Sequence, residues 1–462
     1  LFSRACPTYN LKMGEKNGLS SDALIAKKKR RVCFHDVDPG IDAHECLEIY
    51  LVSSEEDVDS EDGGYLISPV NLVGFFDENE VTIYGYKNLE ITVWISILSF
   101  CAYAEVSFDE QADYGKGITD LNLALMKMFG DTLVQDKDTF LQTFTTEKDF
   151  ISSIISQGEK IFPIMGNGHV NYNDDVPSAN AEIKVIRLKF DNQAAAILYY
   201  RLVPLVLLLV DGSNTIEVTD PNWELYVLVR SHKEDGSERL VGFTAIYRFY
   251  RYPEHFRFRL GQILVLPPFQ RQGYCRKLLE ELHNVAVSED IYDLTVEEPL
   301  DSFQKVRNCF DIERLVNYEP IQQRLDDAVD LVRSTKKNVI PPASLLEDVR
   351  KALKITRKHF SQCWEVLLYI RMHSSEEALS DYVAMLSDRI KIALIGREPK
   401  LRQLFQIANE YNEDMSFVIT RTFDPTILQQ AAQNQPHLDE HLATLVRERT
   451  REITLILEKL QI

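Results

Sequence analysis

One segment of the sequence, residues 260–299, constrains the fold more than any other. An apolar strand, GQILVLPP, stops at Pro267-Pro268 and enters the turn QRQGYC at 270–275, which opens an amphipathic helix. A second strand follows at 292–298 and ends in two glutamates before Pro299. A glycine turn at a helix start aims unpaired N–H groups and the positive end of the helix dipole at an anion. The segment therefore predicts a phosphate cradle, with carboxylates at the same end of the sheet.

Two commoner phosphate loops do not match this turn. The P-loop ends in Gly-Lys-Ser/Thr and the dinucleotide fingerprint needs three spaced glycines, and the segment has neither pattern. The turn resembles the Gln/Arg-x-x-Gly-x-Gly/Ala motif of the acetyl-CoA-dependent N-acetyltransferases with the GNAT fold. Together with QILVLPPFQRQG, the segments IYGYKNLEI, VGFTAIYRFYRYP and YDLTVEEP sharpen the resemblance to the type B histone acetyltransferase family, over residues 75–316.

The resemblance and the changes in composition along the chain predict an α/β protein with four parts. We expect a disordered tail with a basic cluster at 1–40, an N-terminal α/β domain that contacts histone at 41–165, a GNAT catalytic domain at 180–300 and a helical C-terminal region at 301–462. The catalytic domain is expected to hold a mixed sheet flanked by helices. The apolar run at 194–210 fits either a helix or a buried strand, because Pro204 weakens a helix. The helical region receives no chemistry.

The net charge and the cysteines indicate which kinds of binding partner and which cellular compartment the protein is expected to have. The net charge of −20, from 51 basic and 71 acidic residues, disfavours nucleic acid as a partner and favours a cationic peptide. The alternative is that the acidic surface serves only to keep the protein soluble. The seven scattered cysteines predict reduced thiols without structural zinc. The longest apolar run, 202–210, is shorter than the ~20 residues of a membrane helix, and no signal peptide is recognised.

These patterns predict a soluble protein of the nucleus and cytoplasm. The basic cluster at 27–31 is typical of a nuclear import signal, although any solvated cluster of Lys and Arg has the same pattern. Met13 is a natural start, so residues 1–12 are expected to be leader.

The resemblance implies transfer of acetyl from CoA to a lysine amine. Only about one lysine amine in 10³ is neutral at pH 7, so its deprotonation costs about 4–5 kcal/mol. Glu297 matches the general base of the family, and strand alternation puts it on one face with Asp293 and Thr295. Glu298 stands where the family usually has Asp, and either takes part in catalysis or caps the next helix. Asp211 stands where relatives carry a glutamate proposed as a second base, but it also fits an ordinary turn.

Acetyl-CoA is the implied cosubstrate, and no metal is implied. By resemblance, the pantetheine arm would meet the backbone of a splayed strand and the pyrophosphate would meet the turn. The residues are Ile263, Leu264 and Val265 for the arm, and Gln270, Arg271, Gln272, Gly273, Tyr274 and Cys275 for the pyrophosphate. A core strand and a plain turn are the alternatives, and Cys275 departs from the Gly or Ala of the motif. Arg307 either contacts CoA phosphates or pairs with Asp311 along its helix.

A histone tail is the implied peptide substrate, and a WD-repeat histone chaperone is the implied partner. Acidic and aromatic groups that match family peptide contacts suit a lysine-rich tail: Asp77, Glu78, Glu80, Tyr247, Arg248 and Phe249. Arg248 replaces a neutral residue, so it either repels the tail or turns away. We expect a histone H-four acetyltransferase. The alternatives are a GNAT enzyme acting on another protein or amine, and a catalytically silent histone-binding adaptor.

Overall fold

The computed structural model describes residues 40–60, 63–76, 81–112, 117–161, 181–232, 236–395 and 435–460. These described residues belong to one compact unit. The acidic loop 77–80, the basic cluster 27–31 and Met13 lie outside the described residues, so their predicted roles stay predictions. None of the helices in the described ranges is long and apolar enough to cross a membrane.

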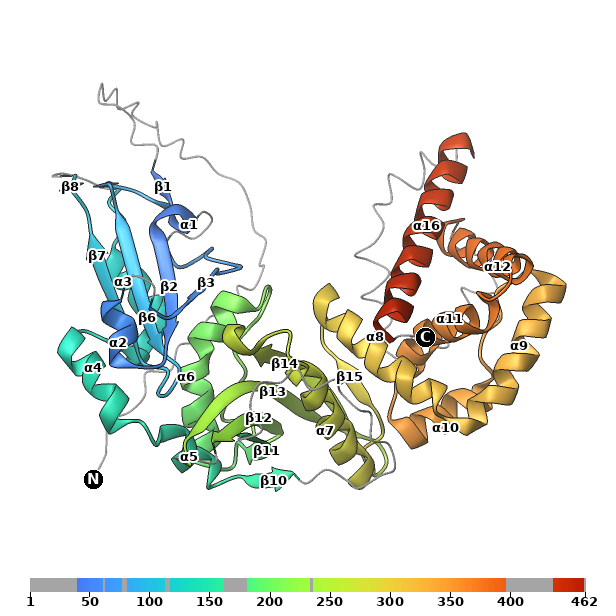
Figure 1. Cartoon of the computed structure of the whole chain (residues 1–462), viewed down its shortest axis with the longest axis horizontal. Helices are drawn as coiled ribbons and strands as arrows, with labels where there is room; N and C mark the ends of the chain where they lie inside the picture. The colour runs from blue at the N-terminus through green and yellow to red at the C-terminus, as the bar shows by residue number, and fades with distance from the viewer. Residues whose placement is uncertain are drawn as a thin grey trace, which may run out of the picture. The chain divides into compact units, whose positions relative to one another are not determined.

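A five-stranded mixed sheet forms the N-terminal part (Figure 1). Its order is β3-β2-β6-β7-β9, with bounds Tyr65–Ile67, Leu47–Val52, Glu90–Ser96, Ala102–Ser107 and Leu133–Val134. Two small ladders pair β1 (Ile41–Asp42) with β4 (Thr82–Ile83), and β5 (Tyr86–Lys87) with β8 (Glu110–Gln111). The helices are α1 (Ala43–Cys46), α2 (Glu55–Asp59), α3 (Leu121–Phe129), the 3-10 turn η1 (Gly130–Thr132), α4 (Lys137–Thr146) and α5 (Phe150–Ile155).

The central part is a six-stranded sheet in the order β10-β11-β12-β13-β14-β15. The bounds are Glu159–Ile161, Ala181–Lys189, Trp223–His232, Glu238–Arg251, His255–Val265 and Leu294–Val296. Neighbours are antiparallel except β14 and β15, which are parallel. Because side chains alternate along a strand, Leu225 of β12 packs with α6 (Gln193–Leu209), whereas Tyr226 packs with α7 (Tyr274–Ser288). The two helices therefore cover opposite faces of this sheet, which agrees with the expected mixed sheet flanked by helices (Figure 1).

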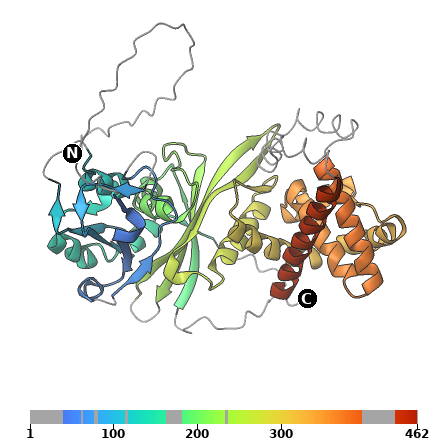
Figure 2. The same cartoon turned by 90° about the horizontal axis from the view of Figure 1, so that it is seen from above.

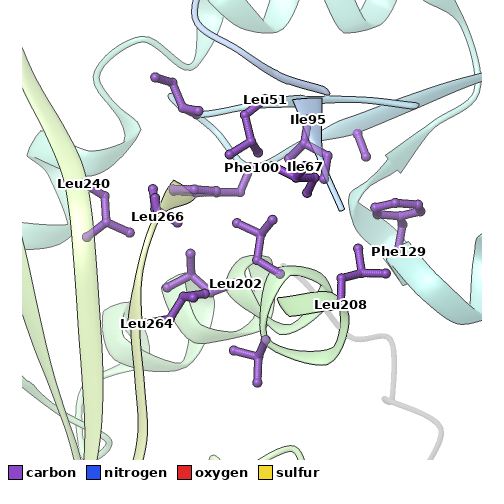
Figure 3. Close-up of a cluster of buried hydrophobic side chains, with 14 of the residues drawn as sticks. Leu51, Ile67, Ile95, Phe100, Phe129, Leu202, Leu208, Leu240, Leu264 and Leu266 are labelled. Carbon is purple, nitrogen blue, oxygen red and sulfur yellow. The ribbon is translucent and has the colours of Figure 1, made fainter. Parts of the chain in front are cut away.

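The two sheets share one hydrophobic core around α6. In Figure 3, Leu51 and Ile95 of the N-terminal sheet lie across from Leu202 of α6, with Leu264 and Leu266 beside them. Leu266 is fully buried. The end of β14, where the cosubstrate is expected to bind, is thus fixed by residues of both sheets.

The C-terminal region is helical, as expected. Its elements are α8 (Asp301–Val316), the 3-10 turn η3 (Glu319–Ile321), α9 (Gln322–Thr335), α10 (Ala343–Leu353), α11 (Arg357–Met372), α12 (Glu376–Ile395) and α16 (Gln435–Leu460). They enclose a separate core that includes Phe360, Trp364 and Tyr382. In Figure 2, α16, in red, packs with α8, α11 and α12.

The beginning of the central sheet differs from the sequence-based expectation. Residues Glu159–Ile161, which we placed in the N-terminal domain, form β10 at the edge of the central sheet, and β11 was not anticipated. The apolar run at 194–210, which fitted either a helix or a buried strand, forms a helix, α6, with Pro204 inside it. A proline costs a helix interior about 3 kcal/mol. Leu198, Leu202 and Leu205 are fully buried, and each contributes about 1.5–3 kcal/mol, so burial outweighs the proline.

Candidate active site

The predicted cradle is a turn of open backbone. After β14 and the 3-10 turn η2 (Pro267–Phe269), Gly273 is the N-cap of α7 with φ of 82°. Gly273 has no side chain to occupy the first-turn N–H groups, and among the described residues no heavy atom outside Gly273, its two chain neighbours and the backbone of its own helix lies within 4 Å of the point where a Cβ would be. Gln270 Nε2 donates to Val265 O at 3.0 Å and holds the turn from inside. The turn therefore leaves room for an anion at a helix N-terminus.

The other residues of the turn divide between solvent and core. Arg271, with φ of 65°, and Gln272 are exposed, whereas Tyr274 is buried. Cys275 packs against the core beneath α7. Burial raises the pKa of the Cys275 thiol to about 12, so the thiol stays protonated at neutral pH. Its departure from the motif is accommodated because the side chain enters the core.

The strands β14 and β15 part beside the cradle. β15 pairs with β14 only through Phe258–Leu260, and Glu297 N donates the last bond, to Leu260 O at 2.9 Å. Within the described residues, 262–265 then pair with β13 alone. Ile263, Leu264 and Val265 turn their side chains into the cores, so their backbone is what they offer to a ligand. This divergence is the predicted splay.

Gly261 brings three groups together where the strands part. It is an extra residue of β14, because Ala245 pairs with Gln262 and Ile246 with Leu260. A Cβ on Gly261 would lie 2.9 Å from Trp223 Cη2 and 3.7 Å from Glu297 Oε2. The glycine therefore lets the Trp223 ring and the Glu297 carboxylate approach the backbone.

The base predicted from the sequence stands on the open face of β15. Leu294 and Val296 pack towards α7, so Thr295 and the exposed Glu297 lie on the other face. Asp293 is buried in an ion pair with Arg257, whose Nε lies 2.6 Å from its Oδ1. Of Asp293 and Glu297, Glu297 is thus the carboxylate that stands open to a substrate.

The two neighbouring candidates are placed differently. Glu298 is exposed with φ of 34°, and α8 has Leu300 as its N-cap, so the capping interpretation of Glu298 is wrong. Asp211 lies exposed in the turn after α6. That turn is tied to β14 because Gln262 Nε2 donates to Asn214 O at 2.6 Å. The residue next to the bulge therefore anchors the turn that carries Asp211.

The predicted aromatic peptide contacts separate by face. The Tyr247 ring lies 5.1 Å from that of Trp223 and 4.5 Å from that of Phe249. Arg248 points the opposite way, where its Nη1 lies 2.6 Å from Glu289 Oε2 and 3.2 Å from Glu224 Oε1. Tyr247 and Phe249 thus share the face of Glu297, whereas Arg248 does not, and its predicted contact with a peptide on that face is corrected.

Arg307 lies in the interior rather than at the cradle. It is buried, its Nη2 donates to Leu294 O at 3.4 Å, and its Nε lies 3.9 Å from Asp311 Oδ2. Burial lowers the pKa of the Arg307 guanidinium. This placement favours pairing with Asp311, the alternative to a phosphate contact.

Sequence reasoning missed Trp223 and Gly261. A glycine inside a strand pattern signals a bulge or a close backbone approach, and that signal marks Gly261. Trp223 carries no comparable signal, because an aromatic residue at a strand start is ordinary. Within the described ranges, no group of three or more His, Cys, Asp or Glu side chains is arranged to hold a metal.

Comparison with known proteins decides the family. The model for the histone acetyl transferase HAT1 N-terminus matches residues 39–211, and that for the acetyltransferase (GNAT) family matches 211–305. The histone acetyltransferase type B catalytic subunit of Arabidopsis thaliana is 43% identical over 448 residues, which cover 94% of this chain and 95% of the relative. The chain belongs to this family.

Other type B catalytic subunits are similar over most of the chain. The Zea mays protein is 39% identical over 412 residues, covering 87% of this chain and 85% of the relative. A Dictyostelium discoideum protein is 26% identical over 377 residues, covering 79% and 75%. As a type B family member with a GNAT domain, the chain is an acetyl-CoA-dependent acetyltransferase, and the open turn at Gly273 fits the pyrophosphate of that cosubstrate.

Proposed function

We propose that this type B family member acetylates lysine amines in the N-terminal tail of free, newly synthesised histone H-four, with Glu297 as general base. Its similar relatives are named histone acetyltransferases. The observation that carries the proposal is the position of Glu297 Oε2, which lies 3.7 Å from the point where a Cβ on Gly261 would be. There the strands part, beside the end of β14 that leads into the cradle.

Proton removal is the contribution of Glu297. A lysine ammonium must lose a proton before its nitrogen can attack, at a cost of about 4–5 kcal/mol at pH 7. Acetyl-CoA, when bound, would supply a thioester carbonyl carbon: the amine nitrogen bonds to it, the carbon–sulfur bond breaks, and CoA leaves as a thiolate that takes up the second proton lost by the nitrogen. Glu297 takes the ammonium proton, and a backbone N–H near Val265 stabilises the charge on the carbonyl oxygen, a contribution of roughly 3–4 kcal/mol in other enzymes. Glu298 and Asp211 are the remaining candidates for a proton relay.

The aromatic face beside Glu297 suits the approach of a lysine side chain. The Tyr247 ring contacts the rings of both Trp223 and Phe249. The three side chains therefore form a continuous apolar surface whose ring faces carry partial negative charge. Such a surface attracts an ammonium group and shields its methylene chain. We assign the flanking residues of the tail to the acidic loop Asp77, Glu78 and Glu80, by ion pairing.

The proposal extends to partner and compartment. By family resemblance we expect a WD-repeat histone chaperone to present the histone, and we expect the enzyme in nucleus and cytoplasm, before histones enter chromatin. A catalytically silent adaptor is less consistent with an open Glu297 and an open cradle. Another protein or a small amine as substrate is the alternative within enzymes.

Radiolabelled acetyl-CoA tests this function. Purified enzyme would be incubated with free core histones and, separately, with nucleosomes that contain the same histones. We expect label on histone H-four among the free histones and none on nucleosomes. Equal labelling of nucleosomes would contradict the type B assignment, and the absence of transfer to any histone would favour the adaptor or a different amine.

A further inference from the structure

The strand that carries the base is held from outside the catalytic domain. β15 has three residues and pairs with β14 along one edge. On the other edge, Leu294 N donates to Lys354 O at 2.9 Å, and Leu294 forms a parallel bridge with Ile355. Lys354 and Ile355 connect α10 to α11, beyond residue 305 where the family-model matches end. The C-terminal region thus supplies the next neighbour of β15.

Two cationic side chains hold the residues that lead into β15: Arg350 in α10 and Lys354, the C-cap of that helix. Arg350 Nη1 donates to Tyr292 O at 2.7 Å, and its guanidinium carbon lies 3.6 Å from the Tyr292 ring centre. Arg251 of β13 lies 3.6 Å from the same ring. Two guanidinium groups this close cannot share one face of a ring, so Tyr292 is sandwiched between them. Lys354 Nζ completes the set, 2.8 Å from Asp290 Oδ1.

These contacts involve cations that have left solvent. Arg350 and Lys354 are 6% and 4% exposed. Burial of a charged group is costly unless it is paired and hydrogen-bonded. Arg350 is also paired with Glu347. Hydrogen bonding from Arg350 is the main cause that lowers the pKa of the Glu347 carboxyl to about 2. The connection is therefore a fixed, charge-paired structure.

A short strand needs such support. A strand of three residues bonded on one edge is marginal alone, and Glu297 lies directly after its last residue. Displacement of a catalytic group by 1 Å can cost about 10²-fold in rate. The contacts from α10 and the α10–α11 connection therefore act where small shifts reach the base.

We propose that Arg350 and Lys354 are positioning residues that hold β15, and through it Glu297, so that the C-terminal helical region is part of the catalytic apparatus. The proposal rests on the function proposed for Glu297. It gives chemical meaning to a region for which the sequence alone indicated none.

Steady-state kinetics of Arg350→Gln in the full chain test the proposal. We expect the kcat to fall roughly 10- to 100-fold, with the acetyl-CoA KM unchanged, because the cradle at Gly273 is not touched. The matched control is Arg371→Gln, an arginine of the same region that pairs with Asp326, and it should keep the wild-type kcat. A normal kcat in folded Arg350→Gln, or an equal loss in the control, would overturn the positioning role.

A second variant avoids dependence on a single substitution. Lys354→Met removes the bond to Asp290 but leaves the backbone bridge, so a smaller fall in kcat is expected, with recovery in Lys354→Arg. An unchanged kcat in folded Lys354→Met would contradict a role for this cation.

The double variant Glu297→Gln/Arg350→Gln separates positioning from general stability. If Arg350 acts through Glu297, its substitution should add no further loss in the Glu297→Gln background. Multiplying losses would show that Arg350 acts otherwise. Normal turnover of Glu297→Gln would overturn the proposed base itself, whereas impaired Glu297→Gln with normal Arg350→Gln would overturn the positioning role alone.

Discussion

The cradle and the base strand, which is β15 with Glu297 directly after it, both adjoin β14. The two are built by different means. The cradle is made of backbone at one helix start, with Gly273 left-handed and Gln270 bonded to Val265 O. The base strand is short and depends on side chains from distant segments, among them Arg257 at Asp293 and Arg350 at Tyr292. The anion site is therefore local in sequence, and the position of the base is a property of the whole fold.

This difference implies that substitutions in the two parts should fail in different ways. A change in the cradle should weaken cosubstrate binding and leave the chemical step intact once the site is filled. A change at Glu297 should leave binding intact and slow the chemical step.

The largest effect is expected from Glu297→Gln. The amide keeps the size of the side chain but cannot take the proton, so the kcat should fall roughly 10²–10⁴-fold near neutral pH. Steady-state kinetics with a histone H-four peptide would measure it. The control is Asp301→Asn, a carboxylate in the first turn of α8, which should retain the kcat. An unchanged kcat in Glu297→Gln would shift the role to Asp211 or Glu298.

A smaller effect is expected from Gly273→Glu in the cradle. The added carboxylate repels a pyrophosphate, and the left-handed backbone is strained by any side chain, so CoA affinity should fall roughly 10- to 100-fold. Calorimetric titration of CoA would report it. Gly273→Ala carries the strain without the charge and should lose less. Equal affinity of folded Gly273→Glu and wild type would mean that the turn is only structural.

A weaker and salt-dependent effect is expected from the acidic loop. Replacing Asp77, Glu78 and Glu80 by Asn, Gln and Gln should weaken the binding free energy of the histone peptide by about 1–2 kcal/mol. The KM for the peptide should therefore rise roughly 5- to 30-fold at low salt. The difference should shrink as salt rises, while the acetyl-CoA KM stays constant. A salt-independent difference would place the tail along Tyr247 and Phe249 instead.

The smallest effect is expected from Cys275→Ala. Folding raises the pKa of this thiol from 9.0 to about 12, so it is protonated and unreactive at neutral pH, and kcat and KM should change less than about twofold. The stability linked to the protonated thiol is complete below pH 9 and is lost as the pH rises from 9 towards 12. Fast alkylation of folded enzyme at pH 8, with loss of activity, would contradict this placement.

The sequence predicted the parts that depend on local pattern. The turn at 270–275, the helix after it and the open face of Glu297 follow from glycine placement and strand alternation. Alternation also predicts that Arg248 points away from Tyr247 and Phe249, although the family match suggested a shared peptide contact.

Other features depend on contacts between distant residues, which no local pattern records. The helix at Pro204 required knowledge of how deeply its leucines are buried. The approach of Trp223 to Glu297 depends on a bulge at Gly261. The bridge from Lys354 to Leu294 joins segments far apart in the chain.

Single-turnover acetyl transfer at increasing acetyl-CoA concentration tests the central difference most directly. Wild type, Gly273→Glu and Glu297→Gln would be compared with one saturating histone H-four peptide. We predict that Gly273→Glu needs more acetyl-CoA but reaches a transfer rate close to that of wild type, whereas Glu297→Gln saturates at the wild-type concentration and at a rate lower by roughly 10²-fold or more. A low plateau in Gly273→Glu, or a wild-type plateau in Glu297→Gln, would contradict the division between a cradle that binds and a strand that carries the base.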